Sequence, residues 1–110
     1  METLPSKDLD LALAALADPT RRAILERLAG GESRVTDLAR PFDLSLNAVS
    51  KHIRVLERAG LVLRRRSGRE HVLSLDLSPL HPVAAWIERR RNPWTSRLDE
   101  LDALLEAERA

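Results

Sequence analysis

The chain has 110 residues, of which 44% are hydrophobic and 32% charged, a composition typical of one globular domain and unlike that of a disordered or fibrous protein. Its net charge of +1 indicates no partner by itself, and the lack of cysteine excludes disulfides, thiolate metal sites and a catalytic thiol. The longest apolar run, 11–17, is too short to span a bilayer, and the acidic start does not resemble a signal peptide. We therefore expect one cytoplasmic domain over residues 1–110, with no membrane partner.

The first predicted helix covers about residues 7–17. Leu9, Leu13 and Leu16 recur at helical spacing, and other apolar residues between them widen the stripe. A helix that is apolar on more than one side needs more than one surface to pack against. We expect it to contact both its own domain and a second copy of the chain.

A second helix follows directly. Asp18 is a favourable N-cap, Pro19 suits the first helical position, and Gly30-Gly31 ends the helix. Arg21 and Arg22 fall on its polar side, where we expect solvation rather than a contact with phosphate.

A short strand at 32–35 and a pair of helices are predicted next. Thr36 is the expected cap of the first helix of the pair, Ser45 caps the second, and Gly60 is the glycine that ends it. One apolar stripe runs along this second helix, made of Leu46, Val49, Ile53 and Leu56. The polar residues off the stripe, Asn47, Ser50, Lys51 and Arg54, suit insertion into a DNA major groove.

The residues after Gly60 predict a hairpin. A strand at 61–63 leads into the basic segment RRRSGRE, whose turn we place at Ser67-Gly68, and HVLSL returns. Alternation along the strand places Arg64 and Arg66 on one face and Arg65 on the other. A helix pair followed by a basic hairpin indicates a winged helix-turn-helix. The expected fold is mainly α with a small β-hairpin wing, in the order α-α-β-α-α-β-β-α.

Positive charge is concentrated on this part of the chain. Residues 45–71 hold seven basic and two acidic side chains, giving +5, whereas the rest holds 11 basic and 15 acidic residues, giving −4. A basic segment in an otherwise acidic chain indicates a polyanionic partner. No large apolar anchor accompanies it, so double-stranded DNA is favoured over a membrane surface.

The last predicted helix covers about residues 79–108. Its spacing of 4-3-4-3-4 is that of a heptad seam, formed by Ile87, Arg91, Trp94, Leu98, Leu101 and Leu105. Pro93 lies inside the seam, so we expect one helix kinked near Asn92-Pro93, although two helices remain an alternative. The seam exceeds what a small domain covers alone, which predicts a homodimer through the first and last helices. The candidate dimer residues are Leu9, Leu13, Ile87, Trp94, Leu98, Leu101 and Leu105.

Three segments resemble one known family. ALADPTRRAILERLA at 15–29, SLNAVSKHIRVLERAGLV at 45–62 and RRRSGRE at 64–70 are similar to the ArsR/SmtB family of winged-helix transcriptional repressors, over roughly residues 9–76. The resemblance implies a sequence-specific repressor that binds an inverted-repeat operator as a homodimer through its first and last helices. The candidate DNA-binding residues are Ser45, Asn47, Ala48, Ser50, Lys51, Arg54, Arg64, Arg66 and Arg69.

The metal sites of that family have no counterpart in this sequence. Arg34 and Thr36 stand where metal-sensing members have a Cys-x-Cys pair. His52, His71 and His81 lie one per element, and none is at a ligand spacing from another. We predict no metal, no cofactor and no enzymatic activity. His52 either reaches DNA or packs at the edge of its helix.

Two other functions remain open. A winged helix used for protein contacts would not need the basic hairpin. A ligand- or metal-gated sensor would need a site that the sequence does not show.

Overall fold

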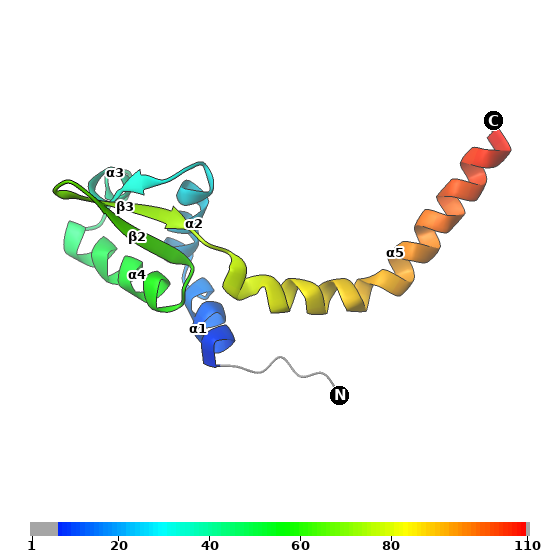
Figure 1. Ribbon diagram of the computed structural model, residues 1–110, viewed down its shortest axis with the longest axis horizontal. Helices are drawn as coiled ribbons and strands as arrows, with labels where there is room; N and C mark the ends of the chain where they lie inside the picture. Colours follow the sequence, from blue (N-terminus) through cyan, green and yellow to red (C-terminus); the bar gives the residue numbers. More distant parts are fainter. Residues whose placement is uncertain (1–6, 110) are drawn as a thin grey trace. The chain divides into compact units, whose positions relative to one another are not determined.

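The computed structural model describes residues 7–109, apart from the side chains of residues 92–96. The chain divides into two compact units, Met1–Leu80 and His81–Ala110. The second unit is the helix α5 (His81–Arg109). The first unit contains, in chain order, α1 (Lys7–Leu16), α2 (Pro19–Ala29), β1 (Ser33–Arg34), α3 (Val35–Ala39), α4 (Leu46–Arg58), β2 (Val62–Ser67), β3 (Glu70–Leu75) and the short 3-10 helix η1 (Ser78–Leu80). This order confirms the predicted winged helix-turn-helix (Figure 1).

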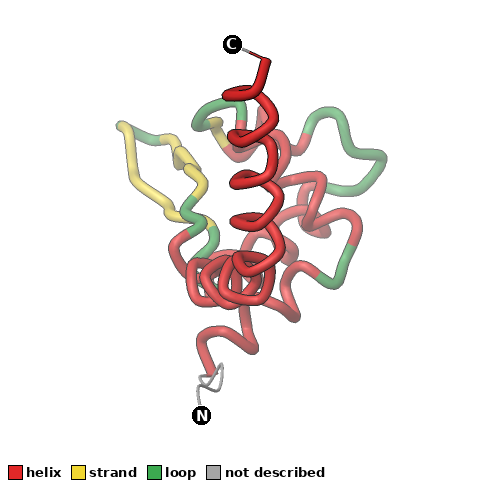
Figure 2. Tube along the Cα trace, turned by 90° about the vertical axis from the view of Figure 1, so that its right-hand side faces the viewer, coloured by secondary structure: helices red, strands yellow, loops and turns green. Residues whose placement is uncertain are grey.

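The sheet is small and antiparallel, with the strand order β1-β3-β2. Strands β2 and β3 form the wing, the hairpin Val62–Leu75, in which Val62 pairs with Leu75 and Ser67 with Glu70. β1 pairs with the other edge of β3, where Ser33 lies opposite Leu73. Figure 2 shows the two strands of the hairpin, in yellow, side by side. The third strand predicted at 32–35 is confirmed.

A continuous apolar core joins the helices to the sheet. Its fully buried large side chains come from α2, α3, α4, the two wing strands and the residue before β2: Ile24, Leu38, Val49, Ile53, Leu56, Leu61, Val62 and Leu73. Because α4 supplies the longest buried row, its orientation about its own axis is set by this core.

Local signals define both ends of α4. The hydroxyl oxygen of Ser45 accepts a hydrogen bond from the backbone N–H of Ala48 at 3.1 Å. At the other end, the N–H of Gly60 donates to the carbonyl of Glu57 and the N–H of Leu61 to that of Leu56, both at 3.0 Å. Gly60 has φ +76°, so the helix ends in a Schellman motif that favours glycine. Both predicted caps are confirmed.

The buried face of α1 differs from the predicted stripe. Leu9, Ala12 and Ala15 are buried, whereas Leu13 is 45% exposed. The small alanines let α1 approach the core closely, and the larger Leu13 is left on the outside. Leu9 is therefore part of the core of its own unit, with little surface left for a second chain.

Arg21 and Arg22 have a structural role that the sequence analysis missed. Arg21 donates from Nε to the carbonyl of Ala15 at 2.7 Å, and Arg22 donates from Nη1 to that of Leu16 at 2.7 Å. These carbonyls end α1, which has no basic residue in its own last turn. The two arginines of α2 thus satisfy the carbonyl end of the preceding helix.

The start of α3 also differs from the prediction. Thr36 was the expected cap, but α3 begins at Val35 and its N-cap is Arg34, whose side chain makes no capping bond. The reason is that β1 pairs through Arg34, opposite Val72, so the chain passes directly from strand to helix.

Helix α5 is continuous over its 29 residues. Pro93 lies within it, and Figure 1 shows one helix that bends partway along its length. A proline ring removes one backbone hydrogen bond and crowds the preceding turn, which bends a helix without necessarily ending it. The alternative of two separate helices is therefore wrong. None of the helices in the described part of the chain combines the length and apolar character needed to cross a bilayer.

Asp18 provides a test of the helix cap of α2. Its carboxylate accepts a hydrogen bond from the backbone N–H of Arg21 at 3.0 Å. That bond, with the nearby charges of His52 and Arg21, holds the pKa of Asp18 below its ordinary value. Asp18→Ala should lower the unfolding free energy at pH 7 by about 1 kcal/mol, measured by urea unfolding.

A lowered carboxyl pKa stabilises the fold above the unfolded pKa, and this contribution is lost as the pH falls through the folded value. The difference between the wild type and Asp18→Ala should therefore shrink below about pH 4. Asp18→Asn is the matched control, because asparagine keeps the accepting oxygen without the charge. A loss in Asp18→Asn as large as in Asp18→Ala would show that charge, not the cap, stabilises α2.

Candidate nucleic-acid interface

Helix α4 presents one polar row to solvent. Its opposite face is formed by Val49, Ile53 and Leu56, each 0% exposed. Steps of 4, 3 and 4 residues place four exposed side chains in one line along the helix, here called the polar row: Asn47, Lys51, Arg54 and Arg58. Burial of one side of α4 thus leaves amide and cationic groups on the other.

The other residues predicted near the start of α4 lie at the edge of this row. Ala48 and Ser50 are half-buried, so they present less surface than Asn47. Ser45 is exposed, but its hydroxyl oxygen already caps the helix. Leu46 was expected in the buried stripe and is instead 52% exposed. It is the first residue of α4 and borders a surface hollow that Ala39 and Phe42 also line.

The wing turn lies one residue later than predicted. Ser67 pairs with Glu70, so Gly68 and Arg69 are the two turn residues. Gly68 has φ +63°, which suits glycine at the first position of a tight hairpin turn. Arg69 therefore lies at the tip and is exposed. Arg66 is exposed on the preceding strand, where its Nε donates to the carbonyl of Gly68 at 3.3 Å.

Two wing arginines are engaged inside the chain. Arg64 donates from Nε to Glu57 Oε2 at 3.1 Å and from Nη2 to Glu57 Oε1 at 2.7 Å. Arg65 pairs with Glu32, which precedes β1. Strand register confirms the predicted alternation, since Arg64 lies opposite the buried Leu73 and Arg65 opposite Val72. Among the basic residues of the segment 45–71, those for which no described carboxylate forms an ion pair are Lys51, Arg54, Arg58, Arg66 and Arg69.

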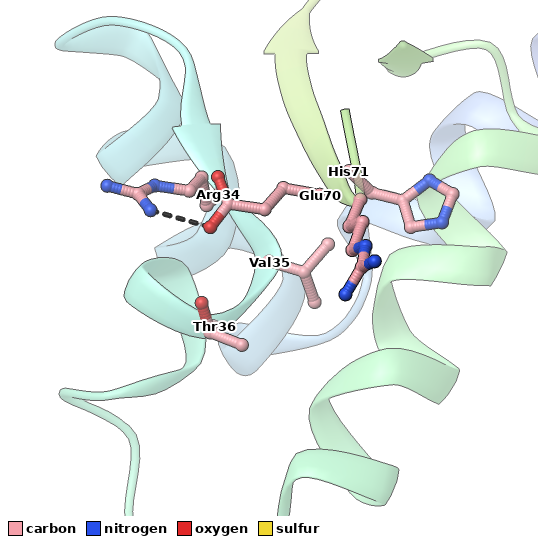
Figure 3. Close-up of a pocket in the computed structure, with 6 residues that line it drawn as sticks. Arg34, Val35, Thr36, Glu70 and His71 are labelled. Carbon is pink, nitrogen blue, oxygen red and sulfur yellow. Dashed lines mark hydrogen bonds and ion pairs between the residues drawn. The ribbon is translucent and has the colours of Figure 1, made fainter. Parts of the chain in front are cut away.

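The end of the wing next to its turn is also linked to the start of α3. Arg34 donates from Nη1 to Glu70 Oε1 at 2.7 Å, across a hollow of about 200 Å³ (Figure 3). The hydrogen bond that Arg34 donates to Glu70, with the nearby charges of Glu70 and Asp37, raises the pKa of Arg34. Arg34 and Thr36 both line this hollow and neither offers a thiolate. Across the described residues, no group of three His, Cys, Asp or Glu side chains lies close enough to hold a metal ion.

His52 faces α2 rather than the polar row. Its Nδ1 lies 3.4 Å from Arg21 Nη1 and 3.8 Å from Asp18 Oδ2. Of the two alternatives for this side chain, packing at the edge of α4 is therefore the one the structure has.

The predicted dimer residues differ in exposure. Leu13 of α1 is 45% exposed, as noted, and Leu9 is 4% exposed. On α5 the exposed aliphatic members of the seam are Ile87, Leu98, Leu101 and Leu105, at 41%, 61%, 53% and 44%. Trp94 lies outside the described side chains. The described part of α5 thus presents a row of aliphatic side chains to its surroundings.

Arg58 was missing from the candidate DNA-binding residues. It completes the polar row one turn after Arg54 and is exposed. The spacing 47, 51, 54 and 58 would have indicated it from the sequence alone.

Comparisons with known proteins agree with this architecture. A sequence family described as a helix-turn-helix domain matches residues 16–65. An HTH-type transcriptional regulator of Mycobacterium tuberculosis is 42% identical over 99 residues, which cover 90% of each chain. The transcriptional repressor SdpR of Bacillus subtilis is 34% identical over 73 residues, covering 66% of this chain and 81% of SdpR.

A solved structure extends the likeness to three dimensions. The crystal structure of an ArsR family transcriptional regulator is 39% identical, with a TM-score of 0.71 over 82% of this chain and 93% of the other. The fold, the polar row on α4 and these relatives together confirm the resemblance seen in the sequence. The chain belongs to the ArsR/SmtB family of winged-helix, DNA-binding transcriptional regulators.

Proposed function

We propose that the chain acts as a homodimeric repressor that binds an inverted-repeat operator, with α4 in the major groove and the wing along the neighbouring minor groove. The polar row of α4 carries this proposal, because the fully buried opposite face leaves the row no other orientation than outward. Asn47 and Lys51 lie within the first two turns of the helix, the part that reaches base edges in docked recognition helices. Arg54 and Arg58 lie further along, where contacts with phosphates hold the protein in register.

The unpaired wing cations support the same orientation. Arg69 at the hairpin tip and Arg66 beside it have no carboxylate partner among the described residues, so their guanidinium groups are available to a polyanion. The narrow minor groove has a negative potential that attracts guanidinium groups. Arg64 contributes less, because Glu57 already neutralises it.

The aliphatic row of α5 supports the dimer. Leu98, Leu101 and Leu105 are each at least 44% exposed, and an exposed row at heptad spacing needs a partner to exclude water. The distribution of charge along α5 favours one orientation of the two copies. The first half of the helix carries basic residues at 89, 90 and 91 and one acidic residue at 88, whereas its second half carries acidic residues at 99, 100, 102, 106 and 108 and basic ones at 97 and 109. Two antiparallel copies of α5 would bring opposite charges together.

A gel-shift titration of the DNA upstream of the chain's own gene tests the proposal. The protein should bind this duplex more tightly than a random one of equal length, with an affinity that falls steeply as salt is raised. Equal binding to both duplexes, or no binding at low salt, would contradict it and favour a winged helix that contacts protein.

Asn47→Ala tests base reading. A bidentate contact to a base contributes about 1–3 kcal/mol, so the variant should lose roughly that much on the operator and little on random DNA. Arg58→Ala is a useful contrast, because a phosphate contact should cost similar amounts on both duplexes. If Asn47→Ala loses affinity equally on both, Asn47 reads no base.

Arg69→Ala tests the wing. Each phosphate contact adds about 0.9 to the slope of log affinity against log salt, and a dimer loses two contacts, so the slope should flatten by roughly 1–2. Arg65→Ala removes the same charge from the same hairpin but starts from a side chain paired with Glu32, so its slope should change less. Equal slopes for the wild type and Arg69→Ala would place the wing tip off the DNA.

Leu98→Glu tests the dimer. A carboxylate in a dry seam lacks hydrogen-bond partners, so sedimentation should show a shift from dimer to monomer while most of the helix content remains. Ala103→Glu adds the same charge to α5 outside the seam and should leave the dimer intact. Dimerisation in both variants would move the interface away from this row.

A further inference from the structure

The bond between Glu57 and Arg64 is unlike the other arginine–carboxylate pairs of the described residues. It is bidentate, with two of the three guanidinium nitrogens, Nε and Nη2, 3.1 Å or less from a carboxylate oxygen. The side chains of Arg64 and Glu57 are only 31% and 26% exposed, whereas the arginines of the other described pairs are at least 52% exposed. A forked, partly covered pair fixes geometry better than a single exposed contact.

The pair joins the two DNA-facing elements of the proposed interface. Glu57 lies in the last turn of α4, and Arg64 is the third residue of β2. The strand register places Arg64 on the side of the sheet that also carries the buried Leu73, the side on which α4 packs. The fork therefore links the middle of β2 to the helix that carries the polar row.

The pair also removes two charges that would otherwise act on DNA. Glu57 lies between Arg54 and Arg58 on α4, where an unpaired carboxylate would repel phosphates. Hydrogen bonding to Glu57 raises the pKa of Arg64 despite its partial burial, in agreement with a cation engaged inside the chain. An arginine held in this way is a poor phosphate ligand.

We propose that Glu57 is a positioning residue for operator recognition: through its fork to Arg64 it sets the distance between α4 and the wing, and it withholds Arg64 from the DNA. This inference rests on the proposed DNA-binding function. In a duplex the major groove and the neighbouring minor groove have a fixed separation. If the distance between α4 and the wing is also fixed, the wing meets its minor groove only when α4 is seated on the correct bases. A wing released from α4 still meets phosphates on any sequence, and discrimination falls.

Glu57→Gln tests the inference, with Glu32→Gln as the matched control. Both variants add one positive charge per chain and release one wing arginine, but only the first breaks the link to α4. The readout is the ratio of affinities for the upstream duplex and a random duplex at one salt concentration. A dimer of Glu57→Gln loses two Glu57–Arg64 pairs. From the usual strength of such ion pairs, we expect this ratio to fall roughly three- to tenfold. Glu32→Gln should keep the wild-type ratio within about twofold.

Arg64→Lys separates geometry from charge. Lysine keeps the positive charge but has no planar fork, so the ratio should fall as in Glu57→Gln while the salt slope stays that of the wild type. This variant also serves if Glu57→Gln fails to fold, which circular dichroism would reveal.

Three outcomes would overturn the inference. Equal falls in Glu57→Gln and Glu32→Gln would show that charge alone matters. A wild-type ratio in Arg64→Lys would show that the fork is not needed. A salt slope in Arg64→Ala as flat as in Arg69→Ala would place Arg64 on the DNA. A wild type that shows no preference for the upstream duplex would instead contradict the proposed function.

Discussion

Burial of one face of α4 is the constraint on which the rest of this structure depends. Val49, Ile53 and Leu56 are inaccessible to solvent and pack with core residues of α2, α3 and the sheet. A helix held by three buried side chains in successive turns has no freedom to rotate without exposing them. The polar row from Asn47 to Arg58 is consequently a fixed array, and a fixed array of donors is what sequence-specific base reading requires.

Ion pairs then sort the basic side chains that follow α4. Counting charges along the sequence treats all seven arginines and lysines between residues 45 and 71 as equivalent. In the structure Arg64 and Arg65 are held by Glu57 and Glu32, whereas Arg66 and Arg69 near the tip are not. Unpaired positive charge thus lies near the turn of the wing, whereas the arginines in the middle of β2 are paired with α4 and with the segment before β1. Arginines that are unpaired near the turn of a hairpin suit a contact that must reach a groove.

Features coded by neighbouring residues could be predicted from the sequence. The caps at Asp18, Ser45 and Gly60 depend on side chains and glycines within a few residues of each helix end, and all three are present as expected. The fold order and the alternation of the wing arginines follow from periodicity, which is also local. The effect of Pro93 was harder to predict, because a proline ring disfavours a helix interior without forbidding it. In the structure α5 continues through Pro93.

Features that depend on which elements meet could not be predicted. From helical spacing, Leu9 and Leu13 were expected to lie on the same apolar stripe of α1. Close packing through Ala12 and Ala15 instead buries Leu9 and leaves Leu13 exposed. Leu46 continued the apolar stripe of α4 in the sequence, yet it lies beyond the core that this helix packs against.

The same limit applies to polar contacts. Arg21 and Arg22 cap α1 because α2 folds back beside its carbonyl end, and nothing in their own helix indicates it. The Glu57–Arg64 fork arises from residues seven positions apart that are brought together only when the wing folds against α4.

Hydroxyl-radical footprinting of the protein on its operator tests the central claim most directly, because it reports which sugars the bound protein covers. A two-fold homodimer with one α4 per half-site should protect two equivalent patches whose centres lie about 10–10.5 base pairs apart, or a whole multiple of that spacing. The sugars between the two patches lie on the opposite side of the duplex and should still be cleaved. A single protected patch, or two patches half a helical turn out of phase, would contradict an account in which paired α4 helices read the same face of the DNA.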